Sequence, residues 1–121
     1  MTHPLVLLSQ PIGVFTIAVL SIFGSAETVR ADAVAVSITL TDGVIAPQNL
    51  TIPSGQAIAL TVRNAGKSSA EFESKQLHIE QVIAPGGTAT IQLRALPAGS
   101  YKFVDEFHED LATGQGEIIA E

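Results

Sequence analysis

Residues 96–108 read LPAGSYKFVDEFH, and this stretch decides the fold more than any other part of the chain. Pro and Gly form a turn, after which Tyr101 and Phe103 alternate with Lys102 as in a half-buried strand. The strand runs into an acidic segment that contains Asp105 and His108. The pattern therefore predicts a β-strand that brings a carboxylate and an imidazole to one short loop.

The chain before and after this stretch consists of short β-rich segments separated by turn residues. Gln56 to Arg63 alternates well, with Ile58, Leu60 and Val62 on one face. No helical stripe of useful length is present beyond residue 33. Short strands with turns at roughly eight- to twelve-residue spacing indicate an all-β Greek-key sandwich. We expect strands at residues 34–40, 44–46, 50–52, 56–63, 70–74, 77–83, 88–93, 101–107 and 116–120.

The beginning of the chain has the composition of an export signal. Residues 4–26 contain no charged side chain, and their most apolar part, 14–23, is followed by the small residues Gly-Ser-Ala. We expect a signal peptide within residues 1–33, cleaved after Ala26 or Ala33, and hence a periplasmic protein. A retained membrane anchor is the alternative, because this run is long enough to span a hydrocarbon core of about 30 Å.

Composition excludes several classes of function. The chain has 12 acidic against 6 basic residues, a net charge of −6, and such an acidic domain does not suit nucleic acid. It suits cations or a basic partner surface. The absence of cysteine excludes disulfides, thiolate nucleophiles, zinc–thiolate sites and a thiolate copper site. We also find no phosphate-binding glycine loop and no Ser-His-Asp order that would indicate hydrolysis.

The spacing Pro-x-Gly-x-Tyr-x-Phe-x-Asp-x-x-His resembles the end of a cupredoxin domain, where Tyr-x-Phe-x-Cys-x-x-His is usual. The Asn-x-Gly turn at 64–66 and the phrases at 70–74 and 82–88 extend the likeness over residues 34–121. The order of these phrases resembles the EfeO-type cupredoxin-like family, which accompanies bacterial ferrous-iron uptake systems. The resemblance implies a cupredoxin-like Greek-key β-sandwich with a metal-binding end.

The sequence departs from the ligand pattern of that family. In blue copper proteins the ligands are a His after the Asn-x-Gly turn, a Cys, a second His and usually a Met. Here Ala70 follows the turn, Asp105 takes the Cys place, His108 is kept, and Ala112 lies near the Met place. Because soft sulfur holds Cu(I) and sets its potential, these changes disfavour simple copper electron transfer.

The remaining residues suit a harder ion. Carboxylates with one or two imidazoles favour Fe(II), Mn(II), Zn(II) or Cu(II) over Cu(I). The resemblance makes His108 and Asp105 the primary metal ligands, with Glu73 or Glu71 from a neighbouring loop and His78 as a second imidazole. We expect the bound ion to be iron or copper.

Each of these residues also has a simpler interpretation. Asp105 and His108 could form a solvated acidic turn. If Phe72 points into the core, Glu71 and Glu73 both point away from it along the strand, as on a solvated edge. His78 is in phase with polar neighbours, which favours a surface position.

The preferred function is capture of iron, or copper, for a membrane uptake system such as an iron permease, with an accessory role in Fe(II) oxidation as an extension. A homodimer that shares a metal ion is compatible with the few imidazoles of one chain. The alternative is a metal-free interaction module that docks its acidic loop, containing Glu106, Glu109 and Asp110, on a basic partner.

Overall fold

The computed structural model describes residues 2–3 and 32–121. The predicted signal peptide or anchor, residues 1–33, lies outside the described residues except at positions 2, 3, 32 and 33. Within the described ranges, no helix is long and apolar enough to cross a membrane.

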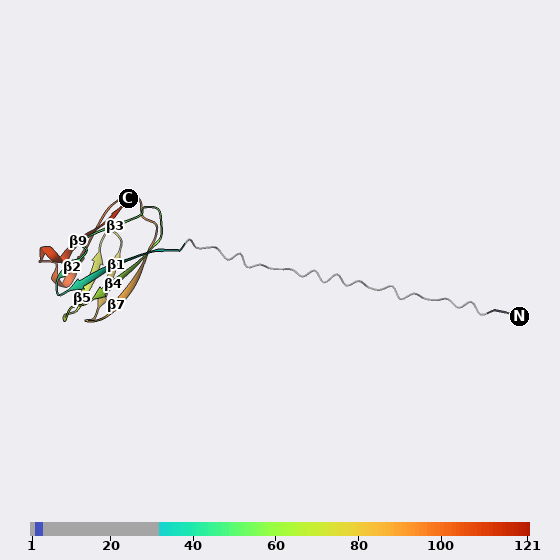
Figure 1. The fold of residues 1–121 in the computed structure, drawn as a ribbon, viewed down its shortest axis with the longest axis horizontal. Helices are drawn as coiled ribbons and strands as arrows, with labels where there is room; N and C mark the ends of the chain where they lie inside the picture. The colour runs from blue at the N-terminus through green and yellow to red at the C-terminus, as the bar shows by residue number, and fades with distance from the viewer. Residues whose placement is uncertain (1, 4–31) are drawn as a thin grey trace.

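The described domain is built from two packed β-sheets (Figure 1). One sheet has four strands in the order β2-β1-β4-β7, and the other has five in the order β3-β9-β8-β5-β6. The elements in chain order are β1 (Val34–Thr41), β2 (Val44–Ala46), β3 (Asn49–Ile52), β4 (Ile58–Asn64), β5 (Ala70–Ser74), β6 (Ile79–Ile83), β7 (Thr88–Leu93), β8 (Gly99–Asp105), the 3₁₀ turns η1 (Glu106–His108) and η2 (Ala112–Gly114), and β9 (Gln115–Ala120).

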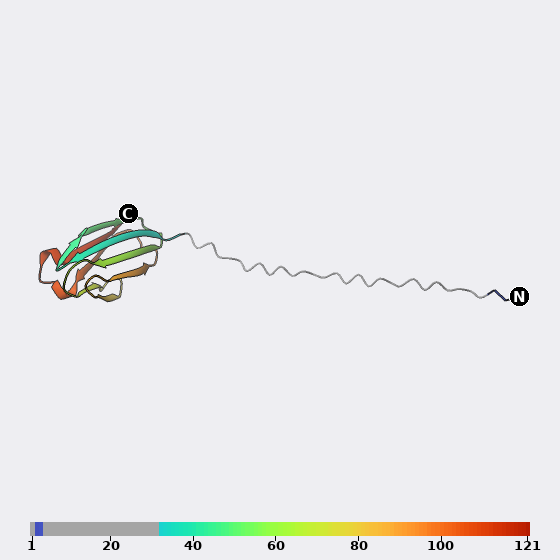
Figure 2. The same ribbon diagram turned by 60° about the horizontal axis from the view of Figure 1, so that its bottom comes forward.

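Both sheets are mixed. β1 runs parallel to β4, and β3 runs parallel to β9, while the other pairs are antiparallel. Parallel neighbours need a crossover, so the chain passes between the two sheets repeatedly instead of completing one before the other. The turned view in Figure 2 shows the resulting layers. The all-β Greek-key sandwich predicted from the sequence is confirmed.

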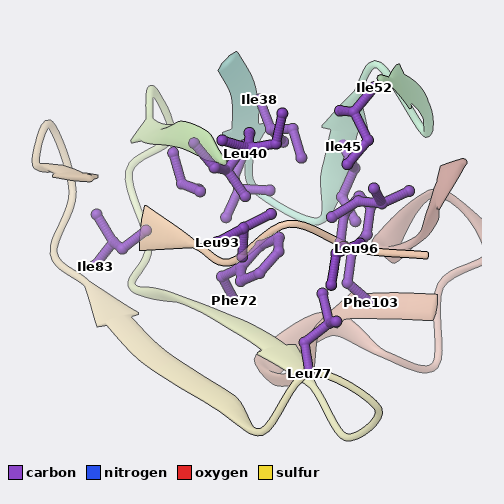
Figure 3. Packing of buried hydrophobic residues seen from close by; sticks show 14 of the residues in the cluster. Ile38, Leu40, Ile45, Ile52, Phe72, Leu77, Ile83, Leu93, Leu96 and Phe103 are labelled. Carbon is purple, nitrogen blue, oxygen red and sulfur yellow. The ribbon is translucent and has the colours of Figure 1, made fainter. Parts of the chain in front are cut away.

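Alternating side chains build the core between the sheets. On β4, Ile58, Leu60 and Val62 are each 0% exposed, whereas Arg63 of the opposite parity is exposed, as the sequence predicted. On the facing sheet, the ring of Phe72 stacks on that of Phe103 with centroids 5.0 Å apart and an interplanar angle of 27°. Figure 3 shows these two rings among the aliphatic side chains of the cluster.

Several strands begin or end one or two residues away from the prediction, and one of these differences matters for the site. The strand expected at 101–107 ends at Asp105, and Glu106–His108 form the 3₁₀ turn η1, which packs over β5. The alternation of buried side chains along β8 ends at the same point. Phe103 is buried, whereas Phe107, which follows the turn, is exposed. The chain therefore turns immediately after Asp105, and this turn positions the candidate site.

The stacked ring of Phe72 is expected to contribute strongly to the stability of the core between the two sheets. Replacing Phe72 by Ala should lower the free energy of unfolding by about 3–5 kcal/mol, since it removes a fully buried ring and leaves a cavity. Phe107→Ala, at an exposed ring, should change it by only about 0.5 kcal/mol. Two-state denaturant unfolding of both variants checks this, and equal losses would contradict the assigned core.

Candidate functional site

Asp105 is a buried carboxylate at the end of β8. Its side chain is 1% exposed, and both of its oxygens have partners. Oδ1 accepts a hydrogen bond from the backbone N–H of Glu71 at 3.0 Å, and Oδ2 lies 2.8 Å from Nδ1 of His108. A buried charge requires this kind of compensation. The two residues that the sequence predicted as primary ligands are therefore in direct contact with each other.

The ring of His108 connects this buried carboxylate to the surface. Its side chain is 21% exposed, and its Nε2 atom lies 3.4 Å from the hydroxyl of Ser68. The Ser68 hydroxyl donates to Oδ1 of Asp42 at 2.9 Å. Because Nδ1–H donates to Asp105, Nε2 carries the lone pair in the neutral ring. We call the four side chains Asp42, Ser68, His108 and Asp105 the polar network.

Asp42 ties two turns together. It lies between β1 and β2 with a φ angle of 44°, and its Oδ1 also accepts from the backbone N–H groups of Lys67 and Ser68 at 2.8 and 3.0 Å. The Ser68 backbone N–H, then the Ser68 hydroxyl and the Lys67 N–H, hold the pKa of Asp42 below its usual value. Sequence reasoning identified the Asp-Gly pair only as a turn and did not single out Ser68.

Two glycines allow these segments to approach one another. A Cβ on Gly66 would lie 2.6 Å from both the backbone N and Oδ1 of Asp42. A Cβ on Gly43, whose φ angle is +86°, would lie 2.6 Å from Leu111 and 3.1 Å from Cβ of His108. These two glycines therefore do more than form turns. A side chain at either position would clash with residues of the polar network or next to it, so glycine is needed for the segments to approach.

Glu71 and Glu73 lie on the face of β5 that points away from the core, because Phe72 between them is fully buried. The predicted solvated edge is nevertheless absent at Glu73, which is only 7% exposed. The turn η1 packs over β5, and the carboxyl groups of Glu71 and Glu73 lie near that of Glu106.

Crowding changes the acidity of these carboxyl groups. Loss of solvation, followed by repulsion from Glu106, raises the pKa of Glu73. Loss of solvation, followed by repulsion from Glu71, raises the pKa of Glu106. Glu73 and Glu106 therefore hold their protons more tightly than isolated carboxyl groups do.

His78 is exposed in the turn between β5 and β6, with a φ angle of 55°. It borders a surface hollow of about 590 Å³ together with Glu73 and Glu80. This turn follows Ser74, the last residue of β5, whereas Asp105 bonds to Glu71 near the start of that strand. The structure thus places His78 apart from the polar network.

No three His, Cys, Asp or Glu side chains come together as a ready metal cage within residues 2–3 and 32–121. The ligand set of His108, Asp105, Glu73, Glu71 and His78 therefore remains a prediction. The structure joins the first two, brings Glu71 and Glu73 together with Glu106, and keeps His78 separate.

The chain belongs to the cupredoxin-like domain family, because the model of that family matches residues 13–120. It is also similar to an uncharacterized protein of Rickettsia prowazekii (strain Madrid E), with 37% identity over 84 residues. That match covers 69% of this chain and 66% of the relative, so the chain spans just under two thirds of the relative's length.

Solved structures support the same fold. Reduced auracyanin of Roseiflexus castenholzii superimposes with a TM-score of 0.61 at 16% identity, covering 74% of this chain and 98% of auracyanin. The metal-binding domain of a Cu(I)-exporting P-type ATPase from Streptococcus pneumoniae D39, solved with Cu(I), gives 0.62 at 13% identity, covering 72% and 84%. A purple cupredoxin from Nitrosopumilus maritimus gives 0.54 at 19% identity, covering 74% and 100%. At these identities the likeness shows the fold alone, and the finer EfeO-type likeness stays a prediction.

The residues of this chain do not fit a copper–thiolate centre. The chain has no cysteine, and the carboxylate of Asp105 at the cysteine place has both oxygens engaged. Nδ1 of His108 is bonded to the same carboxylate. A soft ion such as Cu(I) would therefore have no sulfur ligand at Asp105, and Nδ1 of His108 is already occupied by a hydrogen bond.

The polar network also differs from an activated serine. Asp105, His108 and Ser68 stand in the order carboxylate, imidazole, hydroxyl, which the sequence did not predict. A nucleophilic serine directs its hydrogen to the imidazole, but here that hydrogen goes to Asp42. The adjacent negative charge of Asp42 opposes an alkoxide as well, so the geometry does not favour hydrolysis.

The crowded carboxyls predict a pH dependence of stability. Because the folded pKa of Glu106 lies above its reference value of 4.5, the folded state binds the proton more tightly, and stability falls as pH rises from 4.5 through the folded pKa. Glu106→Gln removes this loss and lets an amide donate to the neighbouring carboxylates. The variant should therefore melt at a higher temperature than the wild type at pH 7 but not at pH 4.

Thermal melts across this pH range check the expectation. Asp110→Asn is the matched control, since it removes an exposed charge of the same loop. A Glu106→Gln variant that is less stable than wild type at pH 7 would show that the carboxylate contributes favourably there.

Proposed function

We propose that this protein binds an iron or copper ion as cargo in the periplasm and passes it to a membrane uptake system such as an iron permease. The observation that carries the proposal is the orientation of His108 by the buried Asp105. Metal-binding histidines commonly donate their other ring N–H to a carboxylate, which fixes the tautomer and raises the basicity of the ligand.

The charge of the surrounding loop supports the same function. Glu106, Glu109 and Asp110 are exposed next to His108, and the whole chain has a net charge of −6. A surface with this charge raises the local concentration of cations. Membership of a family with copper-binding relatives makes a metal-binding role plausible, while the oxygen-rich donor set favours a divalent ion.

The direct test is metal content and affinity. Elemental analysis, anaerobic Fe(II) titration and aerobic Cu(II) titration of the purified full-length chain should show at least one ion bound more tightly than about 100 μM. His108→Ala should abolish this binding, and Asp105→Asn should weaken it by about 10–100-fold, as is typical when an outer-shell partner of a ligand is lost.

His78→Ala is the matched control because it removes an exposed imidazole outside the polar network. Wild-type protein that binds neither Fe(II), Cu(II) nor Zn(II) would overturn the proposal. Retention of full affinity in His108→Ala would show that the ion binds elsewhere.

The second candidate is a metal-free module that docks on a basic partner. It is favoured by Phe107 and Leu111, which are 51% and 43% exposed next to Glu109 and Asp110. An apolar centre with an acidic rim is complementary to a basic protein surface. Under this function, Glu109→Lys with Asp110→Lys should abolish co-purification with the membrane partner, whereas a chelator should leave it unchanged. Loss of the complex on chelation would instead favour metal transfer.

A further inference from the structure

We infer that the cargo ion binds on the outer side of His108, between Nε2 and the carboxylate of Asp42, with the hydroxyl of Ser68 between them. This inference rests on the proposed function and specifies where the ion is held. The inner side of the ring is closed, because Nδ1 and both oxygens of Asp105 are already hydrogen bonded. Asp105 then acts as a positioning residue and Asp42 as a ligand, a role that no sequence motif indicated.

The open electron pair of Nε2 is the first argument. Its neighbour is the Ser68 hydroxyl at 3.4 Å, which is long for a hydrogen bond. That hydroxyl has one hydrogen, which is donated to Asp42 at the shorter distance of 2.9 Å. In the neutral ring, the lone pair of Nε2 thus receives no good hydrogen bond from the Ser68 hydroxyl. A cation is a partner that it can take.

The second argument is the state of Asp42. Its Oδ1 accepts three hydrogen bonds, whereas within the described residues no hydrogen bond reaches Oδ2. The three donors all lie on the Oδ1 side, so Oδ2 remains available as an oxygen ligand. Nε2 and Oδ1 contact the same hydroxyl oxygen, so the imidazole and the carboxylate flank one point on the surface.

The third argument is access. Asp42 and Ser68 are exposed and His108 is half-buried, so the outer side of the ring is reached directly from solvent. Bonds of about 2.0–2.2 Å to nitrogen and oxygen require Asp42 to move toward the ring, which an exposed turn side chain can do. Ser68 can rotate away or supply a third oxygen donor.

The donor set defines the class of ion. One imidazole nitrogen with one carboxylate suits Cu(II), Zn(II) or Fe(II), and water would fill the remaining positions. Two protein ligands agree with the lack of a three-residue cage among residues 32–121. Such an open site releases its ion readily, which suits a protein that passes its cargo on.

The nitrogen that binds the ion can be identified by NMR. Zn(II) is added as a diamagnetic probe to uniformly ¹⁵N-labelled full-length chain, and the histidine ring nitrogens are observed through their carbon-bound protons. His108→Ala assigns the ring. We expect the Nε2 resonance of His108 to shift on binding while Nδ1 stays protonated.

Affinity measurements on carboxylate variants complete the test. Asp42→Asn keeps the Oδ1 acceptor, and hence the turn, but removes the charge; circular dichroism verifies that it folds. It should weaken Zn(II) binding by more than the roughly 10–100-fold typical of an outer-shell change. Glu80→Gln, at an exposed carboxyl group on β6, is the matched control and should leave the affinity unchanged. Glu73→Gln tests the alternative carboxylate ligand.

The outcomes separate this inference from the proposed function. A shift at Nδ1, or an affinity loss in Glu73→Gln that equals the loss in Asp42→Asn, overturns the outer site while metal binding itself stands. A wild-type chain that binds no Zn(II), Cu(II) or Fe(II) overturns the proposed function and this inference with it.

Discussion

The structure of the candidate site depends on one buried carboxylate. Asp105 is 1% exposed, and its charge is compensated by the Glu71 N–H on one oxygen and by His108 on the other. Removing either partner would leave a buried charge without compensation, which is among the costliest defects in a protein interior. This requirement fixes where β8 ends, how η1 lies over β5 and which nitrogen of His108 faces outward.

The carboxylate also explains how a cupredoxin-like fold can exist without the usual copper chemistry. In this chain the segments at that end of the sandwich are joined by hydrogen bonds, from Asp105 through His108 and Ser68 to Asp42. Three separate parts of the chain meet there without a metal–sulfur bond. The inner part of the site acts as a structural support, because both oxygens of Asp105 and Nδ1 of His108 are hydrogen bonded.

The sequence predicts the sandwich well because strand alternation is a local property. Ile58, Leu60 and Val62 show the core face of β4 directly, and Tyr101 and Phe103 do so for β8. The partnership of Asp42 and Ser68 with His108 was not predictable, since it depends on two turns distant in sequence. Likewise, Glu73 lies on the outward face of β5, as alternation predicts. Its burial results from the turn η1, which packs over that face, and strand alternation carries no information about such a turn.

The position of β9 has a consequence for the order in which the domain can form. β9 lies between β3 and β8, with Asn49–Ile52 parallel on one side and Gly99–Val104 antiparallel on the other. The five-stranded sheet therefore stays in two parts until residues 115–120 are available. A chain that lacks residues 115–120 would leave the edges of β3 and β8 unpaired, so the complete sheet forms only once β9 is in place.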